Sequence, residues 1–277
     1  MIQGTKLRIF TDMSTIKTII LMIAVLCVSF LSAHAAGDIT ITVVYNNVPY
    51  DEELTTSWGL SILIEGLEDT ILFDTGGDGS ILLSNMEKLG IAPSIIETVV
   101  LSHIHMDHIG GLSELLQKNN DITVYLPASF PNHLKRNIMS ATKALIPVDT
   151  TQKICAQVWS TGELGTSLRE QSLMITTSKG IIIITGCAHP GIVNIVKYAK
   201  EHFDRDIYLV MGGFHLMAYT EYQVIETIGA LKEMGVRKVA PSHCTGGKPI
   251  ELFKAAWDED FIDLGCGAKL RITFNAQ

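Results

Sequence analysis

The chain has 277 residues and carries 29 acidic against 21 basic side chains, so its formal net charge is −8. An acidic surface without a run of basic residues argues against nucleic acid or an anionic membrane as a partner and leaves a small-molecule substrate as the expected one. The length permits one or two domains, and the sequence shows no internal repeat or low-complexity segment.

The N-terminus has the pattern of an export signal. Three basic residues precede an uncharged stretch at residues 19–31, and an Ala-His-Ala cleavage motif follows at residues 33–35. This stretch suits a signal-peptide core better than a bilayer span, and an uncleaved anchor is the alternative. We therefore interpret residues 1–36 as a signal and residues 37–277 as one domain with a net charge of −10. We expect an exported protein, periplasmic or secreted, without a stable membrane partner after cleavage.

The first half of this domain alternates short strands with helices. Polar turns separate β-branched segments at residues 39–45, 60–64 and 70–73, as is typical of strands. Residues 80–90 have the spacing of a helix that stops at a glycine, and residues 95–101 are apolar enough for a buried strand. A short helix after two glycines at residues 110–111 and a strand at 122–127 complete this half.

The second half has the same style without repeating the sequence. It predicts a hairpin over 171–186, helices over 192–203 and 221–234, and strands over 207–211 and 236–240. Strands that alternate with helices in both halves predict a layered α/β sandwich.

Four predicted strands end in a loop that contains histidine. Six of the nine histidines lie in these loops: His103, His105, His108, His189, His215 and His243. Of the others, His34 falls in the predicted signal, and we interpret His133 and His202 as surface residues.

The densest loop is LSHIHMDHIGG at residues 101–111. His103 and His105 are one residue apart in extended chain and therefore point the same way, so they can hold one metal ion. Asp107 and His108 follow and can hold a second ion nearby. Neutral imidazole and carboxylate suit zinc, with iron or manganese as alternatives, so we expect one or two ions per chain.

The stretch HIHMDH at residues 103–108 resembles the signature of the metallo-β-lactamase superfamily, and the resemblance covers nearly the whole predicted mature chain. It implies an αββα four-layer sandwich with the metal ions between two sheets. It also implies that Asp74, in FDTGG, supports the metal loop without being a ligand. His189 matches the third ligand of the first ion, and His243 matches the late ligand of the second ion.

Three further motifs are similar to a narrower subgroup. They are TGCAHPGIVNIV at residues 185–196, GGFHL at 212–216 and PSHCTG at 241–246. The subgroup is named for dihydropterin-ribofuranosylaminobenzene phosphate synthase, a transferase of archaeal pterin biosynthesis.

One departure from the superfamily concerns the second ion. Most members have an aspartate that bridges both ions at the end of the strand before the last ligand, whereas here that strand ends in Gly212-Gly213. His215 is the nearest metal-binding side chain, and it either completes the second ion's shell, faces the substrate or is structural. The expected ligands are therefore His103, His105, Asp107, His108, His189, His243 and His215, with Asp107 and His215 also expected in catalysis.

Two cysteines lie within two residues of an expected ligand. Cys187 and Cys244 either pack behind the ligands or pair with each other, and a ligand role is the least favoured reading. Glu170, Gln171 and Trp58 lie near strand ends, where they either contact substrate or pack.

The function that these residues favour is metal-dependent hydrolysis. A bound ion lowers the pKa of water to about 7 and so supplies hydroxide at neutral pH, while a second ion orients the substrate. The first alternative is a transferase of the subgroup's type, against which export counts because activated pterins are cytoplasmic. The second is a non-catalytic metal-loaded binding module. The missing bridging aspartate makes β-lactams a less favoured substrate class.

Overall fold

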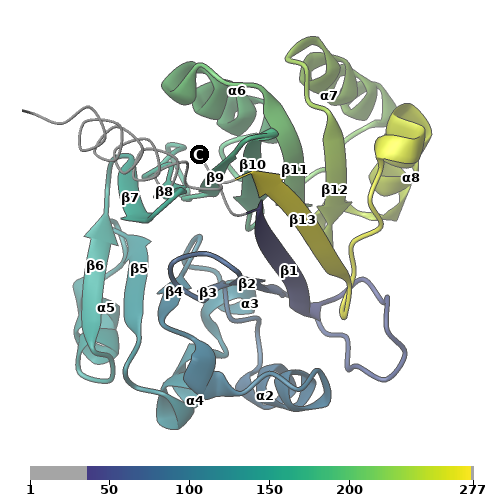
Figure 1. Cartoon of the computed structure of the whole chain (residues 1–277). Helices are drawn as coiled ribbons and strands as arrows, with labels where there is room; N and C mark the ends of the chain where they lie inside the picture. Colours follow the sequence, from purple (N-terminus) through teal and green to yellow (C-terminus); the bar gives the residue numbers. More distant parts are fainter. Residues whose placement is uncertain (1–35, 276–277) are drawn as a thin grey trace, which may run out of the picture.

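In a computed structural model, which describes residues 36–275, two β-sheets lie face to face with helices on both outer faces (Figure 1). The predicted αββα sandwich is confirmed. The predicted signal at residues 1–36 lies, except for its last residue, outside the described part of the chain. Among residues 36–275, no helix combines the length and the hydropathy needed to cross a membrane.

The first sheet has seven strands in the order β13-β1-β2-β3-β4-β5-β6. The strands are β1 (Ala36–Asn46), β2 (Leu60–Glu65), β3 (Ile71–Phe73), β4 (Thr98–Val100), β5 (Thr123–Pro127), β6 (Ala144–Val148) and β13 (Lys269–Asn275). Pairing is antiparallel from β13 to β3 and parallel from β3 to β6.

The second sheet has six strands in the order β12-β11-β10-β9-β8-β7. The strands are β7 (Gln152–Cys155), β8 (Val158–Ser160), β9 (Leu173–Thr177), β10 (Gly180–Thr185), β11 (Ile207–Gly213) and β12 (Lys238–Ser242). The predicted hairpin is the antiparallel pair β9–β10, and β10, β11 and β12 run parallel.

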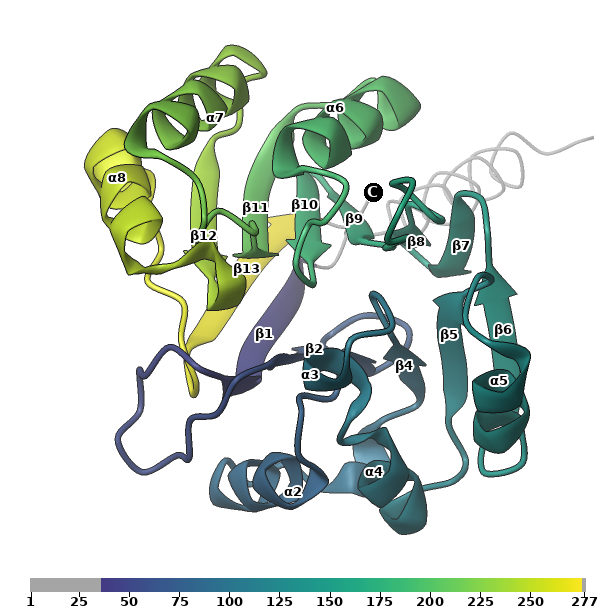
Figure 2. The same cartoon turned by 180° about the vertical axis from the view of Figure 1, so that it is seen from behind.

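Helices cover the outer face of each sheet (Figures 1 and 2). The first sheet carries α2 (Gly79–Lys88), α4 (Leu112–Lys118) and α5 (Asn132–Met139), and the second carries α6 (Ile192–Phe203), α7 (Glu221–Glu233) and α8 (Gly247–Trp257). Between the sheets lies a core of fully buried side chains such as Ile62, Phe73 and Met211. Each such side chain contributes roughly 1.5–3 kcal/mol relative to an exposed one, so the two inner faces hold the frame of the site together.

One predicted strand is shorter than expected. Residues 95–101 were apolar enough for a continuous strand, but Pro93–Ile95 form the 3₁₀ turn η1 and β4 covers only Thr98–Val100. Proline has no backbone N–H to donate to a neighbouring strand, and it sits comfortably at the start of a helical turn.

The strand ends bring the histidine loops together. Strands β10, β11 and β12 are parallel, so the loops after them emerge at one edge of their sheet, and the loops after β3 and β4 do so in the other sheet. Four of these loops contain a non-glycine residue with positive φ: Asp74 (59°), Ala188 (59°), His215 (54°) and His243 (52°). Such conformations cost of order 1–3 kcal/mol each and persist where the surroundings enforce them.

Candidate metal centre

The first group of convergent side chains is His103, His105 and His189. Their ligand atoms lie within 4.8 Å of one another. Nε2 of His103 is 3.1 Å from Nδ1 of His105, and the ring of His189 is 4.8 Å from that of His103 and 5.0 Å from that of His105. His103 is fully buried, whereas His105 is exposed, so the group opens to solvent on one side. These are the three residues expected to hold the first ion.

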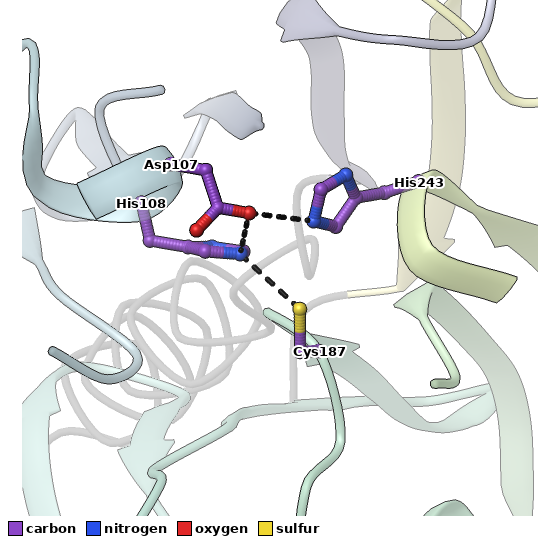
Figure 3. A group of neighbouring side chains, drawn as sticks. All are labelled: Asp107, His108, Cys187 and His243. Carbon is purple, nitrogen blue, oxygen red and sulfur yellow. Dashed lines mark hydrogen bonds and ion pairs between the residues drawn. The ribbon is translucent and has the colours of Figure 1, made fainter. Parts of the chain in front are cut away.

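The second group is Asp107, His108, His243 and Cys187 (Figure 3). Nε2 of His108 lies 3.5 Å from Oδ2 of Asp107 and 3.2 Å from Sγ of Cys187, and Nε2 of His243 lies 3.3 Å from the same Asp107 oxygen. The His103 and His108 rings are 4.2 Å apart, so the two groups are adjacent. The structure thus brings together Asp107, His108 and His243, the three residues whose sequence positions pointed to a second ion.

Of the three alternatives for His215, a place in the second group is not what the structure shows. The fourth side chain of that group is Cys187, for which a ligand role was the least favoured reading. His215 instead lies with Cys187 and Cys244 in a third cluster, and its ring is 4.3 Å from that of His189. It is exposed, and the hydrogen bond with Cys244 raises its pKa. The reason is the end of β11, where Gly213 has no side chain and leaves room for Cys187, in the loop after β10, to reach the second group.

Three of the histidines have their Nδ1 atoms fixed by a neighbour. Nδ1 of His108 is 2.7 Å from Oδ2 of Asp74, and Nδ1 of His243 is 2.6 Å from Oδ1 of Asn47. Both partners accept, so these nitrogens donate and the proton of each neutral ring is on Nδ1. Nε2 then keeps a lone pair directed into the centre, which is the tautomer that a metal ligand needs.

A relay through Ser102 sets the third ring. Ser102 Oγ donates to Oδ2 of Asp74 at 2.7 Å, so at 2.8 Å it accepts from Nδ1 of His103. Asp74 also accepts from the backbone N–H of Ser102 at 2.7 Å and is fully buried. The hydrogen bonds that we expected between Asp74 and the metal loop are therefore present, and one carboxylate orients two ligand histidines.

Two further observations fit a metal ion. Among the described residues, the buried Nε2 of His189 has no hydrogen-bond partner, and the buried Nε2 of His243 faces only the Asp107 carboxylate, 3.3 Å away. A buried polar atom without a partner is destabilising, and a bound metal ion would satisfy it. Imidazole, carboxylate and thiol donors at these positions match the ligand types of zinc. The residues present therefore fit a metal centre.

The electrostatics separate the two groups. Burial, helped by neighbouring imidazoles, lowers the pKa of His103 far below its usual range and that of His189 to about 4, so both rings are neutral at pH 7. Burial also lowers the pKa of His108, but the carboxylates of Asp74 and Asp107 outweigh it and raise that pKa to about 10. An ion entering the second group therefore displaces a proton from His108, so its affinity depends on pH.

Sequence reasoning left the role of Glu170 open, and the structure defines it. This fully buried carboxylate accepts backbone N–H bonds from Cys187 and Ala188 through Oε1, at 2.9 and 2.8 Å, and from His189 through Oε2, at 2.8 Å. Burial raises its pKa to about 7. Glu170 thus holds the loop that delivers both Cys187 and His189. The only signal in the sequence was an acidic residue directly before an apolar hairpin.

The open side of the centre has two features. Trp58 is 49% exposed, and its ring lies 5.0 Å from that of His243. On the side of His189, a cavity of about 450 Å³ is lined by the segment 164–168 and by Pro190, Asn194 and Tyr198. A small molecule can therefore approach the first group from this cavity.

Comparison with known proteins identifies the family. A family profile described as the metallo-beta-lactamase superfamily matches residues 59–151. A Methanocaldococcus jannaschii protein named 7,8-dihydropterin-6-methyl-4-(beta-D-ribofuranosyl)-aminobenzene-5'-phosphate synthase is 30% identical over 267 residues, covering 79% of this chain and 91% of the relative. The chain belongs to the metallo-β-lactamase superfamily.

Solved structures of the metallo-β-lactamase superfamily agree in fold. One described as a metal-dependent hydrolase of the β-lactamase superfamily is 26% identical, with a TM-score of 0.72, and the match covers 85% of this chain and 99% of that one. A metallo-β-lactamase-fold protein from Bacillus subtilis is 16% identical, with a TM-score of 0.64, and the match covers 85% of this chain and all of that one. The predicted resemblance to the synthase subgroup is likewise confirmed by the archaeal relative.

Proposed function

We propose that the protein is a metal-dependent hydrolase with a two-ion centre, in which His103, His105 and His189 hold one ion and Asp107, His108, His243 and Cys187 hold the other. One observation carries the proposal: Ser102, Asp74 and Asn47 engage the Nδ1 atoms of three buried histidines, so in each neutral ring Nε2 is the atom with a lone pair directed into the centre.

Zinc is the ion that this donor set favours. Imidazole alone would suit several first-row metals, but a thiol in the second group adds a soft ligand that manganese does not prefer. Divalent ions in such a pair supply Lewis-acid activation of the substrate and a lowered pKa for bound water.

The chain's own residues contribute orientation and proton handling. Asp107 is only partly exposed and lies within 3.5 Å of His108 and His243, so it either binds the second ion or accepts a proton during turnover. Burial raises the pKa of Asp107, but hydrogen bonds to His108 and His243 outweigh it and the net shift is downward, so the group is a carboxylate at neutral pH. His215, exposed beside the first group, is in position to contact the substrate.

Group transfer is the second candidate. It is favoured by the name of the archaeal relative, a synthase that aligns with this chain over 91% of its own length. Both functions would use the same two ligand groups, so the ligands do not discriminate between them. The two reactions differ in the acceptor, which is water in hydrolysis and a second substrate in group transfer.

The test begins with elemental analysis of the purified protein. We expect about two zinc ions per chain, and the loss of the first ion when His103→Ala is combined with His105→Ala. His133→Ala, at an exposed histidine, is the matched control. Wild-type metal content in the double variant would refute the ligand assignment.

Activity is then measured on esters, lactones, phosphodiesters and β-lactams, with a phosphorylated pterin precursor and its acceptor as the transfer assay. Zinc-dependent turnover of a hydrolytic substrate that the double variant lacks supports the proposal. Turnover only in the presence of the acceptor would replace hydrolysis by transfer.

A further inference from the structure

Two thiols meet at the edge of the second group. Cys187 and Cys244 are both free and buried, and their Sγ atoms, with the nearest ring nitrogen of His215, lie within 4.8 Å of one another. The Cys244 thiol also donates to the backbone carbonyl of Cys187, with the sulfur 3.6 Å from that oxygen. One of the two sulfurs, that of Cys187, is at the same time 3.2 Å from Nε2 of His108. The same thiol is therefore shared between a metal group and a second thiol.

The cysteines meet because the strand between them carries no side chain at its end. Cys187 follows β10 and Cys244 follows β12, and β11 lies between these strands and ends at Gly213. A Cβ atom on Gly213 would lie 2.7 Å from Sγ of Cys244 and 3.2 Å from Cα of Cys187. Any side chain at position 213 would thus occupy the space through which the two loops approach each other.

The arrangement is specific to this pair. Cys155 and Cys266 are also free, but Cys155 contacts the carbonyl of Ala156, and Cys266 contacts Asn85 and backbone carbonyls at β1 and residue 55. Neither belongs to any of the three clusters of metal-binding side chains found among the described residues. Of the four cysteines within residues 36–275, only Cys187 and Cys244 combine mutual proximity with a place at the metal centre.

We infer that Cys187 and Cys244 are a reversible redox modification site, and that their disulfide releases the ion held by the second group. The inference rests on the proposed two-ion centre and adds redox regulation of its metal content. A disulfide closes the two sulfurs to about 2.05 Å, which requires rotation of both side chains and movement of their loops. Once Cys187 is bonded to Cys244, it no longer offers a thiolate to the ion beside His108.

The chemistry needs a two-electron oxidant, and hydrogen peroxide serves. One thiol loses its proton and the thiolate attacks a peroxide oxygen. The O–O bond breaks, a sulfenic acid forms, and the departing hydroxide takes up the thiol's proton and leaves as water. The other thiol attacks the sulfenic sulfur, the S–S bond forms, and the hydroxyl group leaves as a second water with the thiol proton. Overall, two thiols and one peroxide give one disulfide and two waters, and a dithiol reductant reverses the step.

The experiment uses the full zinc-loaded protein, reduced or treated with hydrogen peroxide. Peptide mapping identifies the cross-link, and elemental analysis after gel filtration gives zinc per chain. We expect a Cys187–Cys244 disulfide with the loss of about one ion of two, and recovery of that ion after reduction and zinc addition.

Two variants separate the causes. Cys244→Ser keeps the Cys187 thiol and should retain both ions at the peroxide dose that releases one from the wild type. Cys155→Ser is the matched control, and it should respond as the wild type does.

The two proposals fail in different ways. A reduced protein that binds fewer than two ions overturns the two-ion centre, whatever the mapping shows. A reduced protein with two ions that keeps both after the cross-link has formed overturns the redox inference alone. So does oxidation that leaves Cys187 and Cys244 unlinked, or an ion loss of equal size in Cys244→Ser.

Discussion

Replacing Asp74 by asparagine tests how the chain sets the tautomer of a ligand histidine. The carboxylate is buried and accepts three hydrogen bonds, from the N–H and the hydroxyl of Ser102 and from Nδ1 of His108. Asparagine keeps one oxygen for the Ser102 N–H but presents an NH₂ group on the other side. That group faces Nδ1 of His108 as a donor, so the ring is driven to place its own proton on Nε2, the atom that is to bind the ion.

The structure gives the size of the effect. The NH₂ group replaces the oxygen that accepts from both His108 and the Ser102 hydroxyl, so two hydrogen bonds to a charged group are lost. The one from His108 bears on the second ion, and such a bond contributes about 1.5–3 kcal/mol. A factor of ten corresponds to about 1.4 kcal/mol, so the second ion should bind roughly 10- to 150-fold more weakly. The first ion is affected only through Ser102 and should lose less.

The assay is zinc titration of the metal-free protein against a competing chelator, with the two binding steps resolved. Asp121→Asn makes the same chemical change at an exposed carboxylate and should alter neither step. Ser102→Ala provides the converse, because it removes the hydroxyl at Nδ1 of His103 but leaves the Asp74–His108 pair, so it should weaken the first ion more. Unchanged zinc binding in Asp74→Asn, or a larger loss at the first ion than at the second, would refute the tautomer argument.

Three further predictions follow from the same geometry. Glu170→Ala leaves three backbone N–H groups of the 187–189 loop without their acceptor and should lower zinc affinity about 10–100-fold, as changes behind metal ligands do. Glu201→Ala, at an exposed carboxylate on α6, is the control, and equal affinities in the two variants would contradict the role. His215→Ala should retain both ions, because Cys187 rather than His215 belongs to the second group, while turnover falls because His215 is in position to contact the substrate. Elemental analysis that shows loss of the second ion would instead identify His215 as a ligand. Chelation should lower the melting temperature measured by calorimetry, since each ion adds about 2.7 kcal/mol at a concentration 100-fold above its Kd; an unchanged melting temperature would argue against any bound ion.

The elements that the sequence predicted are those that carry a strong local pattern. The helix over 192–203 matches α6 residue for residue, and β10 and β11 were visible as apolar runs. The sequence predicts no element in the segment 128–170, although it contains α5, the edge strands β6 and β7, and the short strand β8. These strands have three to five residues each and mixed burial, so pairing with their neighbours rather than their own composition defines them.

The candidate site divides in the same way. His103, His105, Asp107 and His108 share one loop, and their spacing alone predicted that they act together. The place of Cys187 depends on a contact across β11 that exists because residue 213 is a glycine, and a linear sequence does not display such a contact. Sequence spacing therefore predicted the ligand-rich loops, whereas the choice between Cys187 and His215 required the packing of three neighbouring strands.

The second group also accounts for a departure that the sequence had raised. No aspartate follows Met211, and β11 ends in two glycines at the place where most members of the superfamily have a bridging carboxylate. In the structure, the loop after β10 places the Cys187 thiol at the second group, with its sulfur 3.2 Å from Nε2 of His108. The missing carboxylate and the buried cysteine are thus two parts of one arrangement.

The most direct test of the two-ion centre is a crystal structure of the zinc-loaded protein with anomalous diffraction recorded above and below the zinc absorption edge. The account predicts two peaks per chain, one bounded by His103, His105 and His189 and the other by Asp107, His108, His243 and Cys187. A single peak, or a second peak whose ligands are His215 and Cys244 without Asp107 and His243, would contradict it.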